Sequence, residues 1–315
     1  MLNEVKSASG GFDVISIGAA TVDIFVKSDQ FKIDKNLLSL PVSSKNEMTD
    51  SLISSGGGAT NSSVSFSRLD LKSACISLLG DDPLGLYVFK DLKDNQVDTN
   101  FLVHRKMETT DYSVILVGPD GSRSILTNRG STHLEAASID WNKLTNTNWF
   151  YLTSLEGNLD LLEQIIGFAQ DHAIKVSLNP GNRELTLLPR LLPLLPYVNF
   201  LLLNKTESEQ LTGLSIDNDQ FWSKLSSFGS IITAVTNGHD GAYILTNGNK
   251  LYSPIINTQP IDETGAGDAF GSTFIAAQIH GLNLPDSLHW AVKNSASVVS
   301  VLGAKPGLLT VSQIK

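Results

Sequence analysis

The stretch Asp262-Glu263-Thr264-Gly265-Ala266-Gly267-Asp268 leads directly into a long apolar helical pattern over residues 266–280. Three small residues ahead of a helix leave its first N–H groups open to a ligand, and these groups carry the positive end of the helix dipole. Residues 265–267 are therefore a candidate anion hole, and Asp268 is placed to accept a proton from a hydroxyl. Taken alone, a glycine-rich turn with an aspartate that favours the dipole is the alternative.

Short apolar runs alternate with helical patterns along most of the chain. The runs are nearly continuous in apolar residues, as buried parallel strands are, and they cover Phe12–Ile17, Ser73–Leu79, Trp149–Leu152, Ile174–Leu178, Val198–Leu203 and Ile231–Thr236. The helical patterns cover Thr60–Leu69, Pro83–Asn95, Leu159–His172, Thr206–Leu211, Asp219–Phe228, Ala266–His280 and Pro285–Leu302. This alternation predicts an α/β fold with a doubly wound parallel sheet and helices on both faces.

Two regions break the alternation. Residues 24–54 are polar and mixed, and residues 112–127 indicate a hairpin that turns at Pro119-Asp120-Gly121. Strands that leave a parallel sheet in this way often form a small separate layer, and a lid over a site is one use of such a layer. Since no linker divides the chain, we expect one domain over residues 1–315, with lid segments at approximately 22–54 and 105–128.

The composition excludes several classes of function. Lys and Arg number 23 against 32 Asp and Glu, a formal charge of −9 without a long basic run, so nucleic acid and anionic membranes are poor partners. A single cysteine, Cys75, allows no disulfide framework. The first twelve residues contain no apolar core of a signal peptide, and prolines interrupt the most apolar stretch, 187–203. We therefore expect a cytoplasmic protein that does not enter a membrane.

Four further stretches are suited to ligand contact. The glycines of the segment 56–61, which reads GGGATN, permit close approach, and its Asn61 can serve vicinal hydroxyls. The segment 204–207 (NKTE) follows an expected strand at the ligand-binding edge of the sheet, where a carboxylate can order Mg²⁺ and its waters. The segment 236–241 (TNGHDG) joins two strands and can admit a nucleotide, and Asp23 can accept hydrogen bonds from two sugar hydroxyls. A flexible loop, a helix cap, a plain hairpin and a surface turn are the respective alternatives.

Together these segments resemble the ribokinase-like (PfkB) family of carbohydrate and nucleoside kinases. The resemblance runs nearly end to end, over the four segments above and over 80–85 (GDDPLG), 179–184 (NPGNRE) and 294–307 (NSASVVSVLGAKPG). It implies a three-layer α/β/α core around a mostly parallel sheet, with a small β-sheet lid. It also implies that the protein transfers the γ-phosphoryl group of ATP to a hydroxyl.

The resemblance further assigns roles to single residues. It implies Asp268 as the catalytic base, with an anion hole made by Gly265, Ala266 and Gly267. The acceptor would be held by Asp23, Gly57, Gly58 and Asn61, and the nucleotide would be bordered by Asn204, Thr236, Gly238, Gly241 and Asn294. Glu207 would act on Mg²⁺ through water. Asp262 and Thr264 match the start of the family's monovalent-cation site, which K⁺ would fill, although Glu263 replaces a commoner small or hydroxyl residue.

A departure from the family pattern bears on the acceptor. Relatives of ribokinase and phosphofructokinase type usually carry Lys after the first two glycines of the acceptor loop, where this chain has Gly58. A phosphorylated sugar needs fixed cations, and this loop supplies none. Cations from the lid region could still reach in, namely Arg105, Lys106, Arg123 and Arg129. We therefore predict a kinase for a small neutral sugar, of ribokinase or fructokinase type.

Two alternatives stay open. A nucleoside kinase, of adenosine or cytidine type, needs aromatic rings against which a base can stack, and Phe25, Phe31 and Tyr112 are available for this. A catalytically inactive scaffold member of the family is the third reading, and the presence of Asp268 argues against it. Because lids of the family sometimes pair, a homodimer formed through the lid is also expected.

Overall fold

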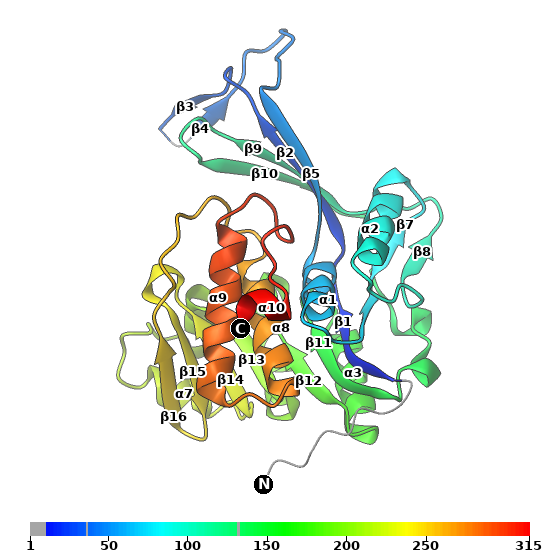
Figure 1. Cartoon of the computed structure of the whole chain (residues 1–315), viewed down its shortest axis with the longest axis vertical. Coiled ribbons are helices and arrows are strands. Elements are labelled where there is room, and N and C mark those ends of the chain that lie inside the picture. The colour runs from blue at the N-terminus through cyan, green and yellow to red at the C-terminus, as the bar shows by residue number, and fades with distance from the viewer. Residues whose placement is uncertain (1–10, 36, 131–132) are drawn as a thin grey trace.

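The computed structural model describes residues 11–35, 37–130 and 133–315. An eight-stranded sheet crosses the centre of the described chain (Figure 1), in the order β16 (Asn249–Ser253), β15 (Ala242–Thr246), β14 (Ile232–Thr236), β13 (Phe200–Asn204), β12 (Lys175–Leu178), β11 (Thr147–Leu152), β1 (Phe12–Ile17) and β6 (Ser73–Ile76). Neighbouring strands from β14 to β6 are parallel, and β15 and β16 return as an antiparallel edge.

Side chains alternate between two apolar cores, one on each face of this sheet. In β11, Phe150 and Leu152 enter one core, while Trp149 and Tyr151 enter the other. The first core is covered by α3 (Leu159–Asp171), α4 (Asn182–Leu185), α5 (Leu188–Leu191), α6 (Lys205–Thr212) and α7 (Phe221–Ser226). The second is covered by α1 (Gly58–Arg68), α8 (Ala266–Ile279), α9 (Leu284–Val299) and α10 (Val311–Ile314). The predicted three-layer α/β/α architecture is confirmed.

Several predicted boundaries were wrong. The expected strand Ser73–Leu79 breaks after Ile76, where buried Ser77 donates its hydroxyl to the Gly18 carbonyl at 2.6 Å. The chain then forms β7 (Leu78–Gly80), which pairs with β8 (Val103–Arg105) beside α2 (Pro83–Asp94). Helix α9 ends at Val299 and not at Leu302, because the Val299 carbonyl accepts the N–H groups of Ile261 and Asp262.

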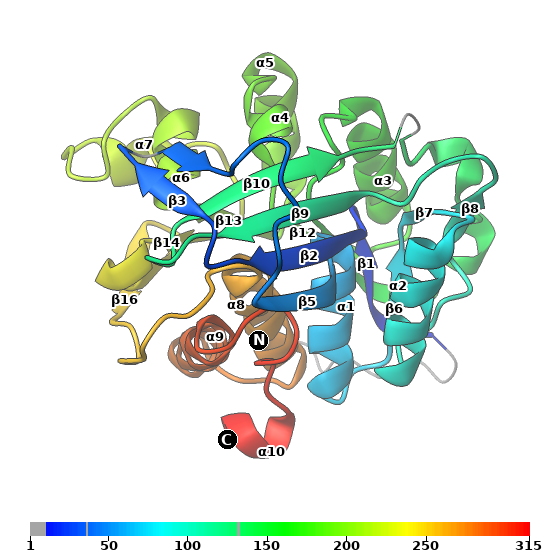
Figure 2. The ribbon, with the colours of Figure 1, turned by 90° about the horizontal axis from the view of Figure 1, so that it is seen from above.

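A second, four-stranded sheet stands above the carboxyl ends of the central strands (Figures 1 and 2), in the order β10 (Arg123–Asn128), β9 (Tyr112–Val117), β2 (Thr21–Lys27) and β5 (Asp50–Gly56). The predicted hairpin is confirmed, since β9 and β10 are antiparallel and Arg123 faces Val117 across the turn. Residues 32–34 and 37–39 form a small ribbon, β3 (Lys32–Asp34) with β4 (Leu37–Ser39). Residue 105, expected in the lid, belongs to β8.

Residues 1–10, on which most of the signal-peptide expectation rests, lie outside the described residues. Within the described residues, no helix has the length and apolar character that crossing a membrane requires.

Candidate active site

A cavity of about 540 Å³ opens where β13 and β14 meet the start of α8. The predicted nucleotide residues Asn204, Thr236, Gly238 and Gly241 all line it. Apolar residues also line it, namely Ala242, Ile255, Ile256, Phe270, Val292 and Val299. This apolar wall is suited to a flat heterocycle, and Ala266 and Gly267 of the predicted anion hole line the same cavity.

The anion-hole loop is shaped for close approach to the helix. Gly265 caps α8 with φ +79°, and a Cβ on it would lie 2.5 Å from the Ala304 side chain, so only glycine fits. Space is open around the Cβ position of Gly267. The Ala266 N–H donates to the Glu263 carbonyl at 3.2 Å. The N–H groups of the next residues in the first turn of α8 have no acceptor within the helix, so they can bind an anion in the cavity.

Asp268 lies in the first turn of α8, next to the predicted acceptor loop. This loop ends at Gly57, the cap of α1, and Gly58 and Asn61 follow in the first turn of α1. The Asn61 amide donates to Asp268 Oδ2 at 2.8 Å, across 207 positions of sequence. Burial raises the pKa of Asp268, whereas the Asn61 hydrogen bond and the charge of Lys305 lower it. A partly shielded carboxylate held by one amide is well placed to accept a proton.

The acceptor loop packs tightly against the residues that follow β1 and β11. Gly57 has φ +91°, and a Cβ on it would lie 2.5 Å from the Ala19 carbonyl oxygen. A Cβ on Gly58 would lie 2.7 Å from Thr153 Cβ, so a side chain at position 58 would collide with Thr153 in this backbone. Nearby Asp23 is 9% exposed, and its pKa is raised to about 6 by burial and by the charge of Asp262, against the opposing effects of Lys305 and a Ser113 hydrogen bond.

Asn204 and Glu207 form a capping box at the start of α6. The Asn204 N–H donates to Glu207 Oε2 at 2.8 Å, and the Glu207 N–H donates to Asn204 Oδ1 at 2.9 Å. Burial raises the pKa of Glu207, and the Asn204 N–H lowers it. Because one oxygen is used by the cap, the other can take a water. The described residues contain no cluster of three acidic, His or Cys side chains for a metal, and Mg²⁺ that binds phosphates and water needs none.

The side chain of Asp262 is already occupied by donors. Its Oδ1 accepts the Arg123 guanidinium and the Thr264 N–H at 2.9 Å, and its Oδ2 accepts the Gly303 N–H at 2.9 Å. Arg123 also donates to the Ile261 carbonyl at 2.6 Å. A monovalent cation at Asp262 and Thr264 would thus have to share the carboxylate with an arginine of the lid.

The model of the pfkB family of carbohydrate kinases matches residues 12–310. The chain belongs to this family. Ribokinase from Schizosaccharomyces pombe is 29% identical over 273 residues, which cover 81% of this chain and 85% of the relative. Deoxyribokinase from Salmonella typhi is 25% identical, over 96% of this chain and 97% of the relative.

The fold of this pfkB kinase is that of solved ribokinases. The structure of Arabidopsis thaliana ribokinase complexed with ribose and ATP matches with a TM-score of 0.80 at 21% identity, covering 96% of this chain and 97% of the other. The resemblance predicted from the sequence motifs is therefore confirmed, and with it the assignment of the chain to the carbohydrate kinases.

One predicted nucleotide residue of this pfkB kinase lies elsewhere. Asn294 is fully buried in α9, where its amide donates to Thr273 Oγ1 at 2.7 Å and its Oδ1 accepts the Leu309 N–H at 2.9 Å. Both ends of its side chain thus hold helix α8 and the C-terminal segment in place. The next two residues, Ser295 and Ala296, line the cavity in its stead.

One further cluster of charged side chains near the site was not identified from the sequence. A small cavity of about 40 Å³ beside Gly18 and Ala19 is lined by Asp111, His133 and Glu156. Glu156 is ion-paired with Arg129 and lies 3.0 Å from His133 Nδ1. Its position just after β11, at the same sheet edge as the other motifs, is a signal that could have identified it.

Proposed function

We propose that this pfkB kinase transfers the γ-phosphoryl group of ATP to a hydroxyl of a small neutral sugar. The observation that carries the proposal is the hydrogen bond between Asn61 and Asp268, which joins the acceptor loop to the first turn of α8. Ala266 and Gly267 of the same turn line the cavity. These contacts support a site in which nucleotide, anion hole, base and acceptor loop are neighbours, as phosphoryl transfer requires.

The residues of this site have distinct tasks in the transfer. The apolar wall takes the adenine, and the N–H groups at the start of α8 stabilise the charge that develops on the moving phosphoryl group. Asp268 takes the proton of the attacking hydroxyl, while Asn61 fixes the orientation of its carboxylate. Mg²⁺, which neutralises phosphate charge when it is bound, would be held by ATP and by water on Glu207.

Charge around the acceptor side supports a neutral sugar. The lid-region arginines are already paired: Arg105 with Ser138 and Glu135, Arg123 with Asp262, and Arg129 with Glu156. Buried Asp23 and half-buried Asp111 add negative charge, and desolvation raises the pKa of both. A second phosphate would meet carboxylates and committed cations, so hydroxyl groups are the better ligands.

The aromatic residues do not favour a nucleoside. Phe25 and Phe31 are 1% and 5% exposed, and half-buried Tyr112 packs against the core that contains Val64 and Val88. None of the three therefore offers a free face for a base to stack on. The inactive-scaffold alternative is disfavoured by the contact that holds Asp268 ready.

The proposal is tested by measuring ADP release in the presence of ATP and Mg²⁺, with pentoses, hexoses, sugar phosphates and nucleosides as acceptors. A neutral sugar should give the highest kcat/KM. Asp268→Asn should lower kcat by roughly 10²–10⁴, because the amide cannot accept a proton, while nucleotide affinity stays close to wild type. Asp217→Asn, at an exposed loop aspartate, is the control and should keep wild-type kcat.

A clear preference for sugar phosphates or nucleosides would contradict the neutral-sugar assignment. Near-normal kcat in Asp268→Asn would show that the base lies elsewhere.

A further inference from the structure

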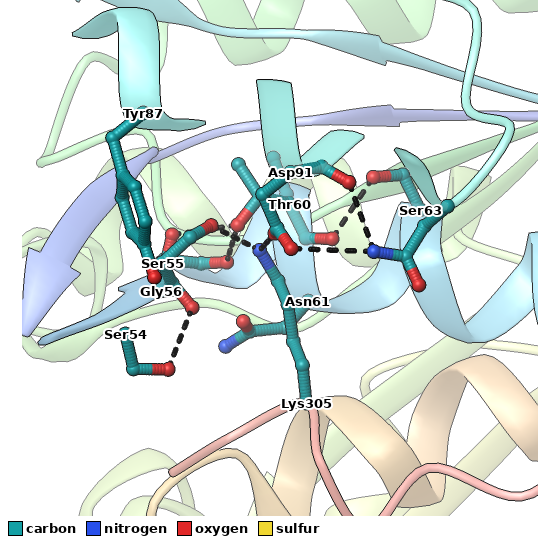
Figure 3. Close-up of polar contacts among 12 residues, drawn as sticks. Ser54, Ser55, Gly56, Thr60, Asn61, Ser63, Tyr87, Asp91 and Lys305 are labelled. Atoms are coloured by element: carbon teal, nitrogen blue, oxygen red, sulfur yellow. Dashed lines mark hydrogen bonds and ion pairs between the residues drawn. The ribbon is translucent and has the colours of Figure 1, made fainter. Parts of the chain in front are cut away.

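Lys305 is a buried cation that the proposed mechanism does not use. It follows α9 in the segment GAKPG, and the residue is only 5% exposed. Its ammonium donates to Ser55 Oγ and to Asp91 Oδ2, the latter at 2.8 Å (Figure 3). Ser55 lies at the end of β5, directly before the acceptor-loop glycines, and Asp91 lies on α2. The ammonium thus binds the start of the acceptor loop.

The same short segment also touches the anion-hole loop. Gly303 donates its N–H to Asp262 Oδ2 at 2.9 Å, and the Ala304 side chain fills the place where Gly265 would carry a Cβ. The Lys305 carbonyl accepts Arg68 Nη1 at 2.8 Å, which fixes the backbone to α1. Residues 303–305 therefore link the two loops between which phosphoryl transfer would take place.

Charged and titratable groups from five elements interact electrostatically with the Lys305 ammonium, and Asp91 is the one that bonds to it directly. They are Arg68 of α1, Asp91 of α2, Cys75 of β6, Asp23 of β2 and Asp268 of α8. Burial lowers the pKa of Lys305, and Asp91 raises it. In return, the charge of Lys305 lowers the pKa of both Asp23 and Asp268.

A purely structural role would not require a cation at position 305. Replacing a buried ion pair by apolar side chains of similar volume is often neutral or stabilising, so anchoring does not require Lys305 and Asp91. Two carboxylates with raised pKa beside the same ammonium give the charge a use in the reaction, since Asp268 must be ionised to act as a base.

We propose that Lys305 is a positioning residue, which fixes the acceptor loop against the anion-hole loop and supplies the positive charge that balances Asp23 and Asp268. This inference rests on the proposed function of the site. Lys305 itself touches neither sugar nor nucleotide, and it acts through Ser55 and through the protonation of the two carboxylates.

Two variants separate the charge of Lys305 from its packing. Lys305→Met leaves the partly buried Asp91, 28% exposed, without its partner, and the Tm of this variant should fall. The double variant Lys305→Met/Asp91→Leu restores an apolar contact and should recover most of the Tm. In both variants kcat/KM for the sugar should drop more at pH 6 than at pH 8, by roughly three- to tenfold, because a larger fraction of the carboxylates is protonated. Lys90→Met removes a lysine that is 73% exposed from the same helix as Asp91. This control should change neither the Tm nor the pH dependence of kcat/KM.

A titration that does not depend on turnover completes the test. Carboxyl ¹³C shifts of Asp23 and Asp268, assigned with their Asn variants, should titrate at higher pH in both Lys305 variants than in wild type. Wild-type titration and pH profile in the double variant would overturn the proposal and leave Lys305 as an anchor alone. If wild type phosphorylates no acceptor, the proposed function fails, and the carboxyl titration still decides the role of Lys305.

Discussion

Asp23 and Asp268 are carboxylates whose pKa is raised by burial, although the function we propose needs both of them ionised. Each is held by one side-chain donor, Ser113 for Asp23 and Asn61 for Asp268, and Lys305 supplies the compensating charge for both. These fixed partners take the place of the water that would otherwise hydrate the two carboxylates. The arrangement costs stability in the free protein, and it prepares the carboxylates to accept hydrogen bonds or a proton from a sugar hydroxyl.

Asp23→Asn should make the protein more stable and less active. The pKa of Asp23 is raised from 3.8 to about 6, so the folded protein binds this proton more tightly than the unfolded chain does. Ionisation of Asp23 therefore destabilises the fold progressively as the pH rises from about 4 to about 6. At pH 7 the variant should gain about 1–3 kcal/mol in free energy of unfolding, and the gain should vanish below pH 4.

Denaturant unfolding of wild type and variant at pH 4 and pH 7 measures this difference. The variant should also lose roughly 10–100-fold in kcat/KM for the sugar, the worth of hydrogen bonds to a charged group. A variant that is less stable than wild type at pH 7 would show that Asp23 is compensated in the free protein.

At the scale of elements, strand β10 of the lid is tied to the loop that leads into α8. Arg123 at the start of β10 reaches both Asp262 and the Ile261 carbonyl. Its guanidinium thus provides a positive charge at the carboxylate where a monovalent cation was predicted. We expect the two cations to compete for Asp262.

Replacing potassium with choline should therefore change the kcat of wild type little. Arg123→Met frees one side of Asp262 and should make kcat depend on K⁺, with a loss of roughly tenfold in choline that K⁺ restores. Arg105→Met, which removes an arginine outside the lid sheet, is the matched control. Strong K⁺ activation of wild type, equal to that of Arg123→Met, would contradict the competition.

How far the sequence predicts each element depends on where its partners lie. The strands β1, β11 and β13 are apolar on both sides because helices cover both faces, and their sequences alone identify them. Strands β2 and β5 were missed, since both mix polar and apolar residues and they pair across about 30 positions of sequence. Strand β5, which reads DSLISSG, has little strand character without β2 beside it.

The residues of the candidate site also differ in how far the sequence predicts them. Gly265 and Asp268 lie in one short segment with a helix behind it, so their chemistry is local and the sequence shows it. The roles of Lys305 and Glu156 depend on partners that are distant in sequence: Asp91 is 214 positions from Lys305, and Arg129 is 27 from Glu156. For Asn294 the family motif predicted a contact with the nucleotide. In the structure, both ends of its amide are hydrogen-bonded to other residues of the protein.

At the scale of the whole molecule, the lid sheet has two unlike faces. Phe25 and Ile115 are buried on the side that faces the kinase core. On the other side, the strand register places Leu126, Val114, Ile24 and Ile53 in one row across β10, β9, β2 and β5. In the middle of the row, Ile24 packs against the apolar core that contains Val64 and Val88. The row is exposed at both of its ends, with Leu126 at 60% and Ile53 at 52%. An apolar row across a whole sheet is typical of a surface that meets another protein.

We therefore propose that two copies of the chain pair through the outer faces of their lids, as a self-complementary two-fold interface would allow.

Ile53→Lys brings two like charges into that interface, so it should shift the protein from dimer to monomer in sedimentation velocity at micromolar concentration. Ile231→Lys is the matched control, because Ile231 is 53% exposed and lies outside the lid. It should leave the dimer intact. Both variants should keep the Tm of the fold, since surface substitutions change stability little. Since we propose that the lid sheet covers the acceptor, the Ile53→Lys monomer should show a higher KM for the sugar with an unchanged KM for ATP. A wild-type chain that sediments as a monomer, or an Ile53→Lys variant that stays dimeric, would show that this row serves another purpose.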